Sequence, residues 1–226
     1  VASLAHELNQ PLAVIQLNAD MTELVLNEHD AKLNKDTSID KAMTGLRKAN
    51  QRAATIISTL RNMFGNGPKS VSKFDFNELV KDVLLLCQPA LQSQSIDMQL
   101  QLHPQSLNFT GDKTQLQQVI LNLVTNASEA FPAAFQGKKI ITIQTNLKDD
   151  RIYLTVSDNG CGIAPEIESL VFDLLRTNKE TGIGIGLWLS KTIVESHKGK
   201  IDFTTRTNFG TSFRVELPCT SGLMYF

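Results

Sequence analysis

Residues 122–130 read Asn122-Leu-Val-Thr-Asn126-Ala-Ser-Glu129-Ala130 and fall within a segment, 113–131, whose apolar residues recur at helical spacing. Asn122 and Asn126 are four residues apart, so both amides lie on the same side of the predicted helix. Asparagine is unfavourable inside helices, and two at this spacing therefore indicate a function. Amide oxygens suit a hard cation such as Mg²⁺, which keeps several waters and bridges phosphates. The alternative is a pair of capping or solvent-facing asparagines.

A turn rich in glycine follows the predicted strand 151–158. Residues 158–162 read Asp-Asn-Gly-Cys-Gly. A carboxylate at a strand end, here that of Asp158, can accept a hydrogen bond from the amino group of adenine. Gly160 and Gly162 allow the backbone to approach a ligand closely. The same residues are a strong signal for an ordinary turn, so this motif is weak when taken alone.

A second glycine-rich stretch, Gly182-Ile-Gly184-Ile-Gly186-Leu187-Trp-Leu, leads into a helix predicted from about Gly186 to Ser196. Backbone N–H groups and the helix dipole make such a junction an anion site. The sequence does not match the Walker pattern, which needs Gly-Lys-Ser/Thr. Three residues of the preceding loop could contact phosphate oxygens: Arg176, Thr177 and Lys179. A solvated surface loop is the alternative.

Residues 6–12 read His6-Glu7-Leu-Asn-Gln10-Pro-Leu, within an amphipathic helix that starts the chain. His6 lies off the apolar stripe and faces solvent. An exposed imidazole beside a carboxylate can act as a nucleophile or proton carrier, and Gln10 lies one turn further along the same face. A surface His-Glu pair without function is the alternative. A zinc protease site is excluded, because position 10 would have to be histidine.

Residues 1–66 show two amphipathic helices and no convincing strand. The second helix has a heptad seam: Ile39, Met43, Leu46, Asn50, Ala53, Ile57, Leu60 and Phe64. Asn50 is its one polar position and can fix the register of packing. A hairpin cannot bury both apolar stripes by itself, so we expect a dimeric four-helix bundle. Packing of the hairpin on the rest of the chain is the alternative.

Residues 67–69 form a predicted linker, since Gly65-Asn-Gly67-Pro68 ends the second helix. Residues 70–218 mix helical and strand patterns, and 219–226 are an unassigned tail. We expect a helix capped by Asn77, a strand over 96–102, and two strand pairs, 139–147 with 151–158 and 200–206 with 210–217. Such helices with a mostly hairpin-connected sheet indicate an α+β sandwich.

The composition is that of an ordinary soluble globular protein, with 42% hydrophobic and 20% charged residues among 226 and a net charge of −1. These values exclude a largely disordered chain and give little support to nucleic-acid binding. The apolar runs are far shorter than the ~20 residues that span a bilayer. Cys87, Cys161 and Cys219 are scattered, which favours a reducing compartment over a disulfide framework or a zinc site. Because the chain begins at Val1, we expect a fragment or a processed product.

The four motifs in this order resemble the catalytic core of a sensor histidine kinase from two-component signalling, over about residues 2–218. The resemblance implies a helical hairpin for dimerisation and phosphotransfer, followed by an ATP-binding α/β-sandwich domain of the type shared with gyrase and heat-shock chaperones. The second lid aromatic usual in the family is absent, with Leu174 and Leu175 standing there. The relatives that hydrolyse ATP have a Glu where this chain has Asn122, which fits transfer to histidine.

The resemblance assigns roles by position. His6 is the implied phosphoacceptor, Glu7 its base or orienting partner, and Gln10 the residue that places a water for phosphatase activity. Asn126 is the implied Mg²⁺ ligand, with Asn122 supporting the metal or the phosphates, and Asp158 reads adenine. Phe172 resembles the aromatic of the lid. The implied nucleotide-lining residues are Gly160, Gly162, Gly182, Gly184, Gly186 and Leu187, with Arg176, Thr177 and Lys179.

The implied function is ATP- and Mg²⁺-dependent autophosphorylation on His6 and transfer to an aspartate of a response regulator receiver domain. The implied partners are this regulator and a second copy of the chain, with no nucleic acid. We expect a cytoplasmic fragment, with membrane attachment only through segments absent from it, such as an anchor in the inner membrane. The alternatives are a nucleotide-binding regulatory dimer without phosphotransfer, a dimerising scaffold, and a phosphatase-dominant kinase.

Overall fold

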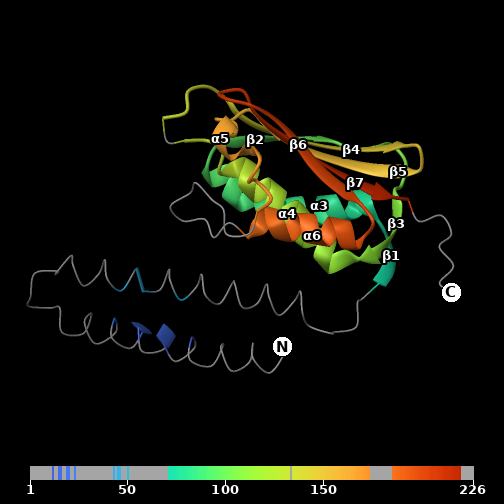
Figure 1. The fold of residues 1–226 in the computed structure, drawn as a ribbon, viewed down its shortest axis with the longest axis horizontal. Helices are drawn as coiled ribbons and strands as arrows, with labels where there is room; N and C mark the ends of the chain where they lie inside the picture. The colour runs from blue at the N-terminus through green and yellow to red at the C-terminus, as the bar shows by residue number, and fades with distance from the viewer. Residues whose placement is uncertain are drawn as a thin grey trace, which may run out of the picture. The chain divides into compact units, whose positions relative to one another are not determined.

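The computed structural model divides into two units, Val1–Pro68 and Lys69–Phe226, which are described separately (Figure 1). The structure describes residues 71–132, 134–173 and 185–219. In the first unit it describes Leu12, Ile15, Gln16, Ala19, Asp20, Glu23, Met43, Gly45, Leu46 and Asn50.

The described residues of the first unit are all helical. Asn50, predicted as the polar position of the seam, is buried, and its amide nitrogen donates to the side-chain oxygen of Gln16 at 2.7 Å. Ile15 and Leu46 are each 44% exposed. The dimeric bundle stays a prediction.

The second unit contains a five-stranded sheet with strand order β2-β4-β5-β7-β6. Its strands are β2 (Ile96–Gln101), β4 (Lys139–Lys148), β5 (Arg151–Asp158), β6 (Lys200–Arg206) and β7 (Gly210–Pro218). The two predicted hairpins, β4–β5 and β6–β7, are confirmed, while β2 pairs with β4 in parallel. A separate antiparallel pair joins β1 (Val71–Asp75) to β3 (Asn108–Asp112). These two short strands were not predicted from the sequence.

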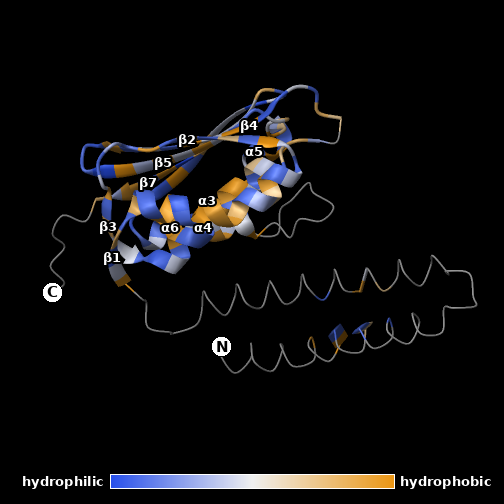
Figure 2. Ribbon diagram, turned by 180° about the vertical axis from the view of Figure 1, so that it is seen from behind, coloured by the Kyte–Doolittle hydropathy of each residue, from blue (hydrophilic) through white to orange (hydrophobic). Residues whose placement is uncertain are grey.

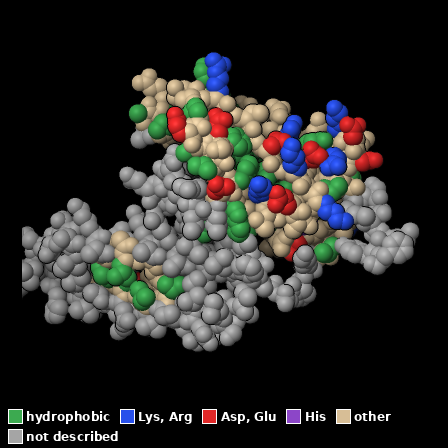
Figure 3. All heavy atoms as spheres, in the orientation of Figure 1, with side chains coloured by type: hydrophobic (Ala, Val, Ile, Leu, Met, Phe, Trp, Pro, Cys, Tyr) green, Lys and Arg blue, Asp and Glu red, His purple; other side chains and the backbone are tan. Residues whose placement is uncertain are grey.

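Three helices cover one face of the five-stranded sheet, giving the predicted two-layer α+β arrangement (Figures 1 and 2). They are α3 (Phe76–Ser93), α4 (Lys113–Ser128) and α6 (Gly186–Ser196); a fourth, α5 (Pro165–Glu168), is one short turn. The apolar side of α4 is buried as its spacing predicts, with Leu123 fully enclosed. Burial of such side chains against the sheet is the main stabilising contribution to the unit. On the face seen in Figure 3, basic and acidic side chains of this unit lie intermixed.

The start of α3 differs from the prediction. Asp75, not Asn77, caps the helix: its carboxylate accepts from the N–H of Asn77 at 2.9 Å and from that of Leu107 at 3.1 Å. Asn77 lies inside the helix, 6% exposed, and its amide donates to the carbonyls of His103 and Gln105. The prediction was wrong because β1 runs directly into α3 without a loop, so the cap is the last strand residue.

Four further boundaries were displaced, and the strands predicted over 139–147 and 210–217 each end one residue later, at Lys148 and Pro218. The helix predicted over 113–131 ends at Ser128. The strand predicted over 96–102 ends at Gln101, and its alternation of burial is incomplete, since Leu100 is 42% exposed at this edge of the sheet. No helix in the described part of the chain has the length and apolar character needed to cross a membrane.

Candidate nucleotide site

Asn122 joins α4 to the start of α6. Its amide nitrogen donates to the carbonyl oxygen of Gly186 at 3.1 Å and to the hydroxyl of Ser190 at 3.3 Å. Its amide oxygen accepts from the side chain of Gln118, one turn earlier, at 2.9 Å. The structure therefore brings the first predicted amide directly against the helix that follows the second glycine-rich stretch.

Asn126 lies one turn further along α4 and is half-buried. Among the described residues, His, Cys, Asp and Glu form no group of three or more that could hold a metal ion. Amide oxygens suit Mg²⁺, which keeps several waters and bridges phosphates. The role of Asn126 as a metal ligand stays a prediction.

The Asp-Asn-Gly-Cys-Gly turn packs against the residues that follow α4. The N–H of Cys161 donates to the carbonyl oxygen of Ala130 at 2.9 Å. A Cβ at Gly160 would lie 2.4 Å from that same oxygen. Gly162 has φ +72°, and a Cβ there would lie 2.5 Å from the carbonyl oxygen of Arg206. Both predicted glycines are thus required by close packing of one backbone segment on another.

Asp158 ends β5, and its carboxylate is oriented by backbone N–H groups. One oxygen accepts from Gly160 at 2.9 Å and from Thr211 at 3.3 Å. Gly210 has φ +100°, and a Cβ there would lie 1.9 Å from the carbonyl oxygen of Asp158. Gly210 and Thr211 were missed from the sequence. The signal available was a glycine at the first position of a strand, where its flexibility otherwise weakens pairing.

Gly186 and Leu187 are the first two residues of α6, as predicted. The residue before them, Ile185, has no polar side-chain atom and so cannot cap the helix. An uncapped helix start, which carries partial positive charge, suits a phosphate ligand.

Phe172, the predicted lid aromatic, lies on the sheet. Its ring is 5.8 Å from that of Phe203 and 6.4 Å from that of Phe213, in edge-on geometry. The ammonium group of Lys191, on α6, lies 5.7 Å from the centre of the Phe172 ring. These contacts anchor the chain where the predicted lid begins.

Eight predicted site residues lie outside the described residues: His6, Glu7, Gln10, Arg176, Thr177, Lys179, Gly182 and Gly184. Their placement stays a prediction.

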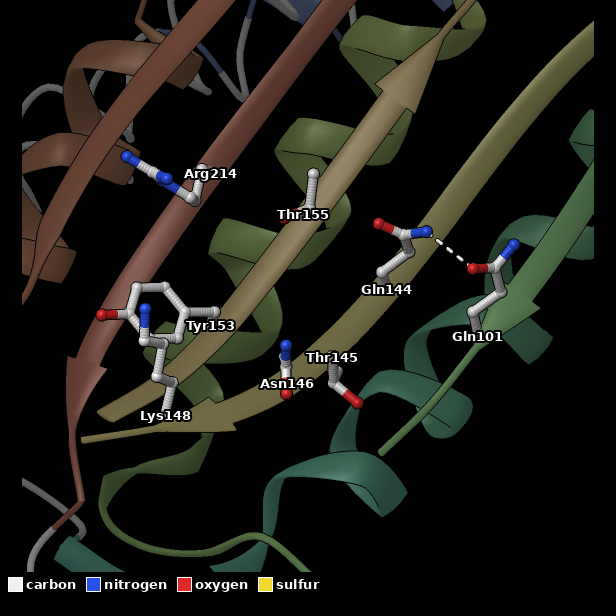
Figure 4. A pocket seen from close by; sticks show the side chains of 8 residues that line it. All are labelled: Gln101, Gln144, Thr145, Asn146, Lys148, Tyr153, Thr155 and Arg214. Atoms are coloured by element: carbon white, nitrogen blue, oxygen red, sulfur yellow. Dashed lines mark hydrogen bonds between the residues drawn. The ribbon is translucent and has the colours of Figure 1, made fainter. Parts of the chain in front are cut away.

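A pocket of about 480 Å³ lies on the opposite, open face of the sheet (Figure 4). Its lining residues are Gln101, Gln144, Thr145, Asn146, Lys148, Tyr153, Thr155 and Arg214. None of them is a predicted site residue, so this hollow is distinct from the arrangement around α4.

Comparison with known proteins assigns the arrangement around α4 to a family. Residues 111–221 match the family of histidine kinase-, DNA gyrase B-, and HSP90-like ATPases. The second unit is a histidine-kinase-type ATP-binding domain. The catalytic domain of the histidine kinase ThkA is similar to this chain, with 29% sequence identity and a TM-score of 0.58. The match covers 66% of this chain and 96% of that one.

Two further relatives extend beyond the ATP-binding domain. The sensor protein FixL of Bradyrhizobium diazoefficiens is 31% identical over 218 residues, which are 96% of this chain but 42% of FixL. ThkA in complex with the response regulator protein TrrA is 24% identical with a TM-score of 0.67, over 97% of this chain and 60% of that one. The latter likeness concerns the fold. This chain spans less than half the length of FixL.

Proposed function

We propose that this chain is the catalytic core of a sensor histidine kinase, which phosphorylates His6 from ATP and passes the phosphoryl group to an aspartate of a response regulator. One observation carries the proposal: α4 and the residues directly after it contact both glycine-containing segments. Asn122 bonds to Gly186, and Ala130 bonds to Cys161 beside Gly160. The family of the ATP-binding domain and the names of its relatives support the same class of enzyme.

In this proposal Asp158 accepts a hydrogen bond from the amino group of adenine. The N–H groups of Gly160 and Thr211 hold its carboxylate in one orientation. The phosphates lie at the start of α6, where the N–H groups of Gly186 and Leu187 meet them. The loop residues that contribute further contacts are Arg176, Thr177, Lys179, Gly182 and Gly184, and Gly162 shapes the adenine turn.

Asn126 would hold Mg²⁺, and Asn122 would support it by fixing α6. When bound, the metal neutralises phosphate charge and holds the phosphates in one geometry. Amide oxygens would suit this ion, which keeps several of its waters when it binds to proteins.

At the phosphoacceptor, a ring nitrogen of His6 attacks the terminal phosphorus of ATP and Glu7 holds the other nitrogen. The bond from that phosphorus to the oxygen of the β-phosphate breaks, and ADP leaves. Catalysis of such a transfer rests mainly on positioning and on charge stabilisation. Gln10 places a water for the phosphatase reaction, in which that water takes the phosphoryl group from the regulator's aspartate and phosphate is released. Residues 1–66 form the dimer and receive the regulator; ThkA, whose fold this chain shares, is complexed with such a regulator. Attachment to a membrane would come from segments outside this chain.

The test is incubation of the chain with γ-labelled ATP and Mg²⁺. Wild type is compared with His6→Gln and with Asp158→Asn, and Asp202→Asn on the open sheet face serves as the matched charge-removal control. We expect label on wild type and on the control, lost in acid and stable in alkali, and none on the other two variants.

Each other outcome identifies an alternative. Label that persists in His6→Gln would place the phosphoacceptor elsewhere. A wild-type chain that binds ATP without becoming labelled would indicate a nucleotide-binding regulatory dimer. Absence of both binding and labelling would indicate a scaffold.

A further inference from the structure

His197 immediately follows α6, and its ring contacts Asp112, the residue that caps α4. Its Nε2 atom accepts a hydrogen bond from the backbone N–H of Asp112 at 3.1 Å, and its Nδ1 atom lies 2.8 Å from the carbonyl oxygen of Ile193. A backbone N–H can only donate, so Nε2 is unprotonated. Nδ1 therefore carries the proton and donates to Ile193. Both ring nitrogens are thus used in hydrogen bonds.

The His197 ring lies where a side chain at position 111 would otherwise be, and Gly111 leaves that space to it. A Cβ at Gly111 would lie 2.8 Å from Cδ2 of His197 and 2.6 Å from the ring of Phe109. Phe109 and His197 pack with ring centres 6.0 Å apart. Any larger residue at position 111 would displace the imidazole, so the glycine is part of the contact.

Asp112, the residue that His197 contacts, is also the cap of α4. Its carboxylate accepts from the N–H of Gln115 at 3.1 Å. The imidazole thus bonds to the residue that fixes where α4 begins. The contact joins the end of one helix to the start of the other.

A second contact joins the same two helices at the other end of α6, where Asn122 bonds to Gly186 and Ser190. Asp112 and Asn122 are ten residues apart, which at ~1.5 Å per helical residue separates the two contacts by about 15 Å. One contact would leave the helices free to pivot about it. Two contacts at this separation fix both their relative rotation and their sliding.

We propose that His197 is a positioning residue for the nucleotide site. By holding the end of α6 on the cap of α4, it sets the place of Gly186 and Leu187 relative to Asn122 and Asn126. His197 itself touches no nucleotide. This inference rests on the proposed function, since it assigns phosphate contact to the start of α6.

Replacing His197 by glutamine or by asparagine tests the two hydrogen bonds of the ring one at a time. Glutamine places a polar atom near the Nε2 position and can keep the bond to Asp112, whereas asparagine reaches only the Nδ1 position and keeps the bond to Ile193. The dissociation constant of the non-hydrolysable analogue AMPPNP with Mg²⁺ is measured for wild type, His197→Gln and His197→Asn. We expect His197→Asn to bind about tenfold more weakly, and His197→Gln to stay within about threefold of wild type.

Amide hydrogen exchange without nucleotide provides a second readout. In His197→Asn we expect faster exchange at residues 187–190, with β6 and β7 unchanged. Equal binding and equal exchange in the two variants would overturn the positioning role. So would an asparagine variant that fails to fold where the glutamine variant folds, because the contact would then serve folding. If wild type binds no AMPPNP, the proposed function fails, and the exchange result alone decides whether His197 positions α6.

Discussion

The side-chain amide of Asn122 donates to the carbonyl oxygen of Gly186 across 3.1 Å, from the middle of α4 to the first residue of α6. The same nitrogen reaches the fully buried Ser190. The sequence suggested a second metal ligand at this position, whereas the hydrogen bonds indicate a structural link between α4 and α6. Such a link contributes to stability even without a ligand, so the structural role can be tested apart from the role in metal binding.

Replacement of Asn122 by alanine removes the hydrogen bonds to Gly186 and Ser190. The hydrogen bond from the Ser190 hydroxyl to the Gly186 carbonyl then remains. We expect the free energy of unfolding to fall by about 1–2 kcal/mol. Urea denaturation of the nucleotide-free chain measures it. The control is Gln118→Ala, which removes only the exposed partner of Asn122, and we expect less than about 0.5 kcal/mol there. Unchanged stability in Asn122→Ala would contradict the structural link between α4 and α6.

Asp158→Asn should weaken AMPPNP binding by about ten- to a hundredfold. The amide keeps the shape of the carboxylate but replaces one acceptor oxygen by a donor, which opposes the adenine amino group. Calorimetric titration gives the dissociation constant. Asp202→Asn removes a carboxylate that pairs with Arg214 on the open face, and should bind as wild type does. Equal affinities for the two variants would remove Asp158 from the site.

Gly210→Ala tests the packing beneath Asp158. Its Cβ would lie 1.9 Å from the carbonyl oxygen of Asp158, so β7 and the turn at 158–162 must separate. We expect the free energy of unfolding to fall by more than about 2 kcal/mol and nucleotide binding to weaken. Gly137→Ala is the matched control. Gly137 also has a left-handed φ of +107°, but a Cβ there has nothing within 4 Å. It should cost only about 1 kcal/mol of backbone strain. Thermal unfolding of both variants distinguishes the steric clash expected in Gly210→Ala from the backbone strain expected in Gly137→Ala.

Asp75 should make the free energy of unfolding of the second unit depend on pH in the acidic range. Burial alone would raise the pKa of its carboxyl, but hydrogen bonds from the Ser106 hydroxyl and from the N–H groups of Asn77 and Leu107 outweigh burial and hold the pKa below the ordinary 3.8. A lowered folded-state pKa means that the contribution is complete above the unfolded pKa and is lost as the pH falls through the folded one.

The corresponding variant is Asp75→Ala. It should cost about 1–2 kcal/mol at pH 7, the typical value of a helix cap. The difference from wild type should shrink below pH 3.8, where the wild-type carboxyl becomes protonated. Denaturation series at several pH values provide the measurement. A difference that stays constant from pH 7 to pH 2 would contradict the assignment of the cap.

The three cysteines should differ in reactivity. Cys161 is exposed in the turn at 158–162, whereas Cys87 is buried and its burial raises the pKa of its thiol. We expect a thiol reagent to modify Cys161 first and Cys87 only on unfolding. Bound AMPPNP should slow modification of Cys161 and leave Cys219 unaffected. Labelling followed by peptide mass analysis gives both rates, and equal protection of Cys161 and Cys219 would argue against a nucleotide beside the turn.

Most elements of the second unit were predictable because their patterns are local. The spacing of Leu116, Val119 and Leu123 identified α4, and the hairpins around the Lys148-Asp149-Asp150 and 206–210 turns followed from alternation. The strands β1 and β3 escaped prediction because each is five residues long and their pairing joins residues far apart in sequence. The cap of α3 was displaced for a related reason, since β1 leaves no loop to mark the helix start.

For the candidate site, the sequence indicated which residues take part but not how they contact one another. Asn122, Asp158 and Gly186 were identified, but not that Asn122 bonds to Gly186. Thr211, Gly210 and His197 were not identified because their roles depend on contacts with Asp158 and Asp112, which lie 52 to 85 positions away along the chain. Such tertiary contacts leave no periodic trace in a sequence.

The parallel pairing of β2 with β4 has a consequence for how the domain assembles. The hairpins β4–β5 and β6–β7 close through short turns and can form early, whereas β2 joins β4 only after β3 and the whole of α4 have crossed between them. Closing that long connection costs chain entropy before any pairing repays it, so non-local strands of this kind join slowly. The helix that carries Asn122 and Asn126 therefore lies within the connection that has to close before β2 can complete the sheet.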